Sequence, residues 1–82
     1  MTAELIFLNN ESNRLMKWKL SENTLYICYL ESNDNRWYHL ETTRDSKATK
    51  DRANDRFKRM VQIVLIDNVT YSLLKLSMDV IE

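Results

Sequence analysis

The chain of 82 residues carries twelve Lys or Arg against twelve Asp or Glu, and it contains neither glycine nor proline. Without glycine it can hold none of the motifs that depend on glycine geometry, namely phosphate loops, dinucleotide-binding turns, nucleophile elbows and EF-hands. Its one cysteine and one histidine cannot supply a metal site of several thiolates or imidazoles, so the composition argues against a known enzyme class and predicts neither metal nor cofactor.

Four strand-length segments fill the first half of the chain and are separated by clusters of Asn and Asp. These short polar side chains tolerate left-handed backbone conformations, so they can take the turn positions that glycine usually occupies. The segments between the clusters are rich in β-branched and aromatic residues, which is typical of strands. We therefore expect strands at 3–8, 14–20, 24–31 and 36–42, joined as an antiparallel meander.

Two short turns, Glu22-Asn23 and Asn33-Asp34, set the expected register of this meander. Alternation then gathers the side chains of one face, which is expected to be core: Met16, Trp18, Leu20, Leu25, Ile27, Tyr29, Tyr38 and Leu40. The opposite face carries Lys17, Lys19, Tyr26, Cys28, Leu30, Trp37 and His39. Lysines among aromatic rings on an open sheet would form a stacking platform for unpaired bases. The alternative, which we prefer because this face is partly apolar, is that the helix or a second subunit covers it.

The same register places Cys28 opposite His39. A thiol beside an imidazole can act as a nucleophile with its base. The sequence offers neither a third group to orient the imidazole nor an evident donor for an oxyanion, so we interpret the pair as ordinary neighbours in a sheet and predict no catalytic residue.

The period changes after the fourth segment. Thr42 with Asp45 resembles a capping pair, and helical spacing follows in Ala48, Ala53, Phe57, Met60 and Val61. We predict a helix over 44–60 that could extend to Ile66. Beyond Asp67-Asn68, the alternation of Leu74, Leu76, Met78 and Val80 predicts a C-terminal strand or hairpin. The expected fold class is α+β: an antiparallel meander of about four strands, one basic amphipathic helix, and the C-terminal strand.

Residues 44–59 hold seven Lys or Arg against three Asp, a net charge of +4, which leaves −4 for the remainder of this neutral chain. On the predicted helix, Arg52, Arg56 and Arg59 fall together on the side opposite Phe57, where guanidinium groups would suit phosphates. The alternative is a solvated face with pairs between Asp55 and these arginines. The candidate RNA-binding residues are Arg44, Lys47, Lys50, Arg52, Arg56, Lys58, Arg59, Lys17 and Lys19.

A chain of this length is expected to form one domain, spanning residues 1–82, whose small core favours a homodimer. The lone Cys28 fits a reducing cytoplasm. The apolar runs at 5–8 and 63–66 are too short for a secretion signal or a membrane span. We therefore expect a soluble intracellular protein with no membrane partner.

The short, Asn-rich chain and its basic segment RDSKATKDRANDRFKR resemble the small accessory proteins of T4-type phages, and among them the TifA family of inhibitors of the ribonuclease toxin ToxN. This resemblance implies a non-enzymatic, RNA-associated inhibitor of a host defence toxin, acting in the cytoplasm of the host cell. One alternative is an inhibitor or adaptor that binds another host protein without nucleic acid. The last alternative is a small enzyme that uses Cys28 and His39.

Overall fold

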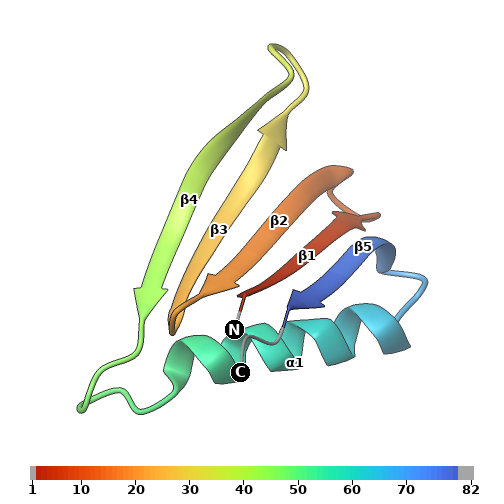
Figure 1. Ribbon diagram of the computed structural model, residues 1–82. Coiled ribbons are helices and arrows are strands. Elements are labelled where there is room, and N and C mark those ends of the chain that lie inside the picture. The colour runs from red at the N-terminus through yellow and green to blue at the C-terminus, as the bar shows by residue number, and fades with distance from the viewer. Residues whose placement is uncertain (1, 80–82) are drawn as a thin grey trace.

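The computed structural model describes residues 2–79 as one five-stranded antiparallel sheet and one helix, so the predicted α+β class is confirmed (Figure 1). The elements are β1 (Thr2–Asn9), β2 (Arg14–Ser21), β3 (Thr24–Glu31), β4 (Arg36–Arg44), α1 (Arg52–Ile66) and β5 (Tyr71–Asp79). The strand order is β4-β3-β2-β1-β5, so the first four strands form the predicted meander. The C-terminal strand β5 pairs with β1 and forms the edge opposite β4.

Asn residues take the turn positions that would otherwise favour glycine, as predicted. Asn13, Asn23 and Asn35 all have positive φ, between 54° and 64°. The turn at Glu22-Asn23 pairs Ser21 with Thr24, as expected for two residues. The next hairpin closes through four residues instead, because its last pair is Glu31 with Arg36. This longer loop is centred on the same two residues and therefore keeps the predicted pairing of Cys28–Glu31, but a bulge shifts the pairing of Thr24–Ile27 by one residue.

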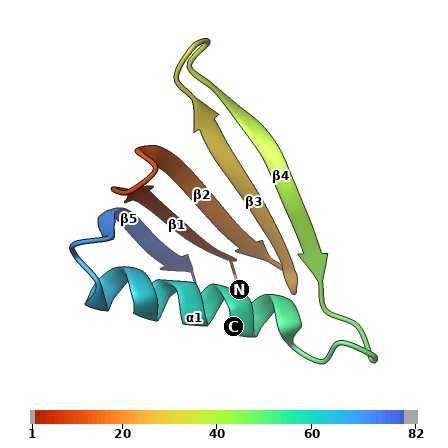
Figure 2. The same cartoon turned by 180° about the vertical axis from the view of Figure 1, so that it is seen from behind.

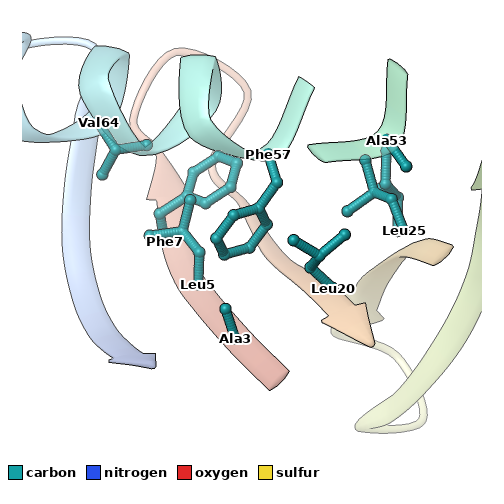
Figure 3. Close-up of a cluster of buried hydrophobic side chains, with 9 residues drawn as sticks. Ala3, Leu5, Phe7, Leu20, Leu25, Ala53, Phe57 and Val64 are labelled. Carbon is teal, nitrogen blue, oxygen red and sulfur yellow. The ribbon is translucent and has the colours of Figure 1, made fainter. Parts of the chain in front are cut away.

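The core lies between α1 and the sheet face that carries the odd-numbered residues of β1 (Figure 3). Phe57 is fully buried and, with Ala53 and Val64, points from the helix toward the sheet. The buried residues contributed by the sheet are Ala3, Leu5, Phe7, Leu20, Leu25 and Ile27. Leu20, Leu25 and Ile27 belong to the predicted core face, so the face assignment is confirmed on β2 and β3.

The core does not extend to β4, although the sequence predicted that it would. Tyr38 is 40% exposed and Leu40 is 53% exposed, while Trp18 is half-buried rather than fully buried. The hairpin of β3 and β4 rises away from α1, so its outer half has no helix above it (Figures 1 and 2). A bulge between Ile27 and Cys28 also interrupts the pairing at Leu40. Pairing alone could not reveal how far the helix reaches.

The sheet face that carries Lys17 and Trp37 is not covered by the helix. The sequence proposed the helix or a second subunit as its cover, and the first of these is wrong. Helix α1 packs on the face of Leu5 and Leu20, whereas Lys17 and Trp37 lie on the other face. The Lys17 ammonium lies 4.2 Å from the centroid of the Trp37 ring. Lys17 is consequently half-buried, while Lys19 is exposed.

The helix begins at Arg52, eight residues later than predicted, because β4 continues to Arg44 and a loop follows. Its N-cap residue, Asp51, has a φ of 53° and makes no capping hydrogen bond through its side chain. Asp45 caps the helix from the loop instead, since its carboxylate accepts hydrogen bonds from the Ala53 backbone N–H and the Asn54 side-chain amide. The predicted pair of Thr42 with Asp45 is therefore wrong.

The helix ends at Ile66, so the longer of the two ends that the sequence allowed is the observed one. Strand β5 confirms the predicted C-terminal strand. The alternation in β5 is broken by a bulge, because Ile6 pairs with Lys75 while Phe7 pairs with Leu73. Leu76 packs against the core, but Leu74 falls in the bulge and is 57% exposed. The last residue of the predicted alternation, Val80, lies outside the described residues.

Candidate nucleic-acid interface

A basic cleft of about 460 Å³ lies beside the first half of α1. Its lining, which defines the basic cleft below, consists of Thr49, Lys50, Arg52, Asp55, Arg56 and Arg59. Four of these six side chains are cations and one is a carboxylate. The four helix residues share one side of α1 because they are spaced three or four positions apart. Lys50 joins them from the loop, where the chain turns into the helix with a φ of 41°.

Arg56 differs from the other arginines of the cleft because it is bound to β4. Its guanidinium pairs with the carboxylate of Glu41, and its Nη1 also donates to Thr43 Oγ1 at 2.6 Å. The same group lies 5.6 Å from the centroid of the Trp18 ring. Arg56 was predicted to project away from the core, but it is half-buried and joins the helix to the sheet. It contributes less free charge to the cleft than Arg52 or Arg59.

The pairing of Arg56 with Glu41 makes stability depend on pH. The hydrogen bond from Arg56 holds the pKa of Glu41 below its ordinary value, and the N–H of Thr70 lowers the pKa of Asp67 in the same direction. Carboxylates of lowered pKa stabilise the fold above their ordinary pKa, and that contribution disappears as the pH falls through the lowered values.

We therefore expect the free energy of unfolding, measured by urea titration, to be constant near neutrality and to decrease below about pH 4. Glu41→Gln should reduce the unfolding free energy at pH 7 by about 1 kcal/mol or less, because the pair is partly exposed, and should weaken the acid dependence. The matched control is Glu11→Gln in the β1–β2 turn. An acid dependence that Glu41→Gln leaves unaltered would contradict this assignment.

The structure does not bring the other predicted cations to the basic cleft. Arg44 ends β4, and Lys47 lies in the loop before α1. Both were predicted to lie on the helix, and neither does. Lys58 lines a small groove with Val61 and Met78, away from the arginines. Lys17 and Lys19 lie on the open face of the sheet. Of the nine candidate residues, the cleft therefore collects Lys50, Arg52, Arg56 and Arg59.

A second cleft, of about 580 Å³, opens where the sheet diverges from the helix. Its lining, which defines the aromatic cleft, consists of Phe7, Asn9, Ser12, Arg14, Met16, Trp18, Met60 and Tyr71. The Phe7 ring meets Tyr71 edge-on at 5.6 Å and Trp18 at 6.4 Å between centroids. Sequence reasoning missed this cleft because apolar alternation indicates only which residues face the helix, not where the layers separate.

Cys28 and His39 are paired across β3 and β4, as the register predicted. In the described part of the chain, the hydrogen-bond partner of the imidazole is Thr42 Oγ1, 3.1 Å from Nε2, rather than the thiol. No three His, Cys, Asp or Glu side chains within residues 2–79 are grouped so that they could hold a metal ion. Over the same range, no helix is long and apolar enough to cross a bilayer.

Comparisons of the chain with protein-family models, with curated proteins and with solved structures give no match.

Proposed function

We propose that this chain is a non-enzymatic phage inhibitor of a host defence ribonuclease toxin, and that it binds the toxin and RNA together. The observation that carries the RNA part is the basic cleft, with its four cations and one carboxylate. Guanidinium groups form paired hydrogen bonds with phosphate oxygens, which suits an arginine-lined cleft to a nucleic-acid backbone. The toxin as partner is inferred from the resemblance to the TifA family in length and in having a basic segment, and the phage origin from the short, Asn-rich chain without glycine or proline.

The charges of Arg52 and Arg59 support this proposal because both side chains are exposed and form no ion pair within residues 2–79. The alternative from the sequence was a solvated face in which Asp55 pairs with these arginines. Among residues 2–79, however, the ion pairs are Arg56 with Glu41 and Lys75 with Glu4, so neither Asp55 pair forms. Phosphates would therefore not have to displace a partner carboxylate from Arg52 or Arg59.

The test is the double variant Arg52→Gln/Arg59→Gln, which removes two free charges and leaves Arg56 bonded to Glu41. If each arginine neutralises one phosphate of a single strand, the log–log salt slope of RNA binding should decrease by about 1.4. Fluorescence anisotropy of a labelled single-stranded RNA over a range of salt concentrations measures this slope. Arg36→Gln, at the far end of the β3–β4 hairpin, is the matched control and should leave the slope unchanged.

Toxin inhibition is measured on the same variants by the cleavage of a substrate RNA by a ToxN-type ribonuclease. A folded double variant that inhibits normally and keeps the salt slope of the parent would overturn the role of the basic cleft. Loss of RNA binding with retained contact to the toxin would show that the protein interface lies elsewhere.

A homodimer completes the proposal, and an apolar patch supports it. This apolar patch covers the end of α1, the following loop and the first half of β5: Leu65, Ile66, Val69, Leu73 and Leu74. Ile66 and Val69 are each 81% exposed, and β5 is an edge of the sheet. Such an edge can pair with a second copy of itself. Leu73 pairs with Phe7 of β1 and Leu76 pairs with Leu5, so both lie on the same face of the sheet.

We expect Leu73→Lys to convert a dimer to a monomer, because it places a charge within the apolar patch at that edge. Light scattering at high micromolar concentration provides the measurement. Leu40→Lys, on the opposite edge strand β4, is a matched control that should remain dimeric. A parent protein that is monomeric at these concentrations would contradict the homodimer.

The same apolar patch favours a second candidate function, inhibition through protein contacts without nucleic acid. In that case the patch binds a host protein, and the arginines contact acidic groups on it. The ratio of absorbance at 260 and 280 nm separates the two functions when the protein is purified at low salt with and without nuclease. Nucleic acid that copurifies and is removed by nuclease supports the first function, whereas a clean spectrum in both samples supports the second.

A further inference from the structure

The basic cleft and the aromatic cleft adjoin each other on one side of α1. Arg56 lines the first and Trp18 lines the second, and the guanidinium of Arg56 lies 5.6 Å from the Trp18 ring centroid. Met60, one turn after Arg56, continues the same helix side into the aromatic cleft. A ligand lying along this side of the helix would therefore meet arginines first and aromatic rings next.

The walls of the aromatic cleft suit a flat, polarisable group. Phe7, Trp18 and Tyr71 supply rings, and Met16 and Met60 supply thioethers, which make favourable contacts with aromatic systems. The volume of about 580 Å³ falls within the range of small-ligand sites, and it exceeds what one flat ring requires.

Polar groups of the aromatic cleft could orient such a ligand. Arg14, Asn9 and Ser12 belong to the lining, and the Arg14 guanidinium lies over the Tyr29 ring at 4.2 Å, which fixes its position. The indole Nε1 of Trp18 is a buried donor without a hydrogen-bond partner in the described part of the chain. Because protein atoms cover this nitrogen, Trp18 would contact a ligand through its ring rather than through its N–H.

We propose that the aromatic cleft holds an unpaired base of the RNA whose phosphates lie in the basic cleft. This inference rests on the proposed function and specifies the ligand as single-stranded, because a base within a duplex could not enter. The ring of the base contacts Met60, Tyr71 and Met16. The open face with Lys17 and Trp37 is on the other side of the sheet, so a strand held in the basic cleft reaches the aromatic cleft more directly.

The two tryptophans of the chain report separately on the two surfaces. Trp37→Phe leaves Trp18 in the aromatic cleft as the only indole, whereas Trp18→Phe leaves Trp37 on the open face. Each variant is titrated with a ten-nucleotide single-stranded oligoadenylate and with an abasic oligonucleotide of the same length and charge. We expect oligoadenylate to quench Trp18 and leave Trp37 unchanged, and the abasic strand to bind about 5- to 100-fold more weakly.

A pair of methionine variants tests the wall of the cleft. Met60→Ala should reduce the preference for oligoadenylate over the abasic strand, because it removes a side chain that contacts the base. Met78→Ala is the matched control, since Met78 is 50% exposed and lies in the groove of Lys58 and Val61. It should keep the parent preference.

The outcomes distinguish this inference from the function on which it rests. Equal binding of the two strands with no change in Trp18 fluorescence would overturn the base site while leaving the RNA function intact. Quenching of Trp37 alone would place the bases on the open face and would equally overturn it. If neither strand binds the parent protein, the RNA function itself fails.

Discussion

Phe57→Ala is expected to destabilise the fold by about 3–5 kcal/mol. Phe57 has the largest side chain among the fully buried residues, and it projects from the middle of α1 into the core, close to Leu5, Phe7 and Leu20 (Figure 3). Its removal leaves a cavity that the neighbouring strands cannot fill. Because small domains unfold with only about 5–15 kcal/mol, the loss is a large part of the total. Urea denaturation followed by circular dichroism measures it.

Leu40→Ala is the matched control, because the sequence assigned Leu40 to the core while the structure exposes 53% of it. This variant should change the unfolding free energy by about 0.5 kcal/mol or less. A loss comparable with that of Phe57→Ala would mean that the core continues beneath β4, contrary to the position of the helix.

Asp45→Ala has the next largest expected effect on stability, about 1–2 kcal/mol. The carboxylate accepts hydrogen bonds from the Ala53 N–H and from Asn54, so its removal leaves the first turn of α1 without its cap. The Asp45 N–H also donates to the Asn23 carbonyl at 2.9 Å, which holds the loop against the β2–β3 turn. Thermal and urea unfolding should both shift.

Asp51→Asn distinguishes this cap from the residue at the helix start. Asp51 makes no capping hydrogen bond through its side chain, and Asn tolerates its left-handed backbone. We therefore expect Asp51→Asn to change the unfolding free energy by about 0.5 kcal/mol or less. If Asp51→Asn costs more than Asp45→Ala, the cap is the residue at the helix start after all.

The strands, the register of β2 with β3 and that of the outer half of the β3–β4 hairpin could be predicted because they depend on local information, whereas the bulge between Ile27 and Cys28 could not. Asn at a positive φ marks three of the turns, and alternation within each strand decides which side chains share a face. Pairs such as Met16 with Tyr29 and Cys28 with His39 follow once the turns are placed. Each of these inferences spans only a few residues, so no knowledge of the helix was required.

The predicted helix start was wrong because it assumed that the capping residues directly precede the helix in the sequence. Thr42 and Asp45 have the spacing of a capping pair, but Thr42 is used by β4 as a strand residue. Asp45 does cap the helix, but across a loop: its carboxylate accepts a hydrogen bond from the N–H of Ala53, eight residues later. A chain that folds back in this way leaves no regular spacing in the sequence.

The candidate site was predicted in part. The sequence located the basic segment and placed Arg52, Arg56 and Arg59 together, whereas the contribution of Lys50 from the loop and the position of Lys58 in a different groove required the structure. Arg56 was expected among the free arginines, but Glu41, fifteen residues earlier, holds it against the sheet. That pairing depends on where α1 lies over β4, which no spacing within the helix reveals.

The sequence alone determined the strands, the turns without glycine, the sheet faces and the charge of residues 44–59, because each depends on neighbours in the chain. Only the tertiary structure decided that the core stops before β4, that Asp45 caps α1, and that the aromatic cleft adjoins the basic one. These features depend on where a single helix rests on a twisted sheet. The helix can bury only the strands beneath it, and where the layers diverge, side chains patterned as core become the wall of a cleft.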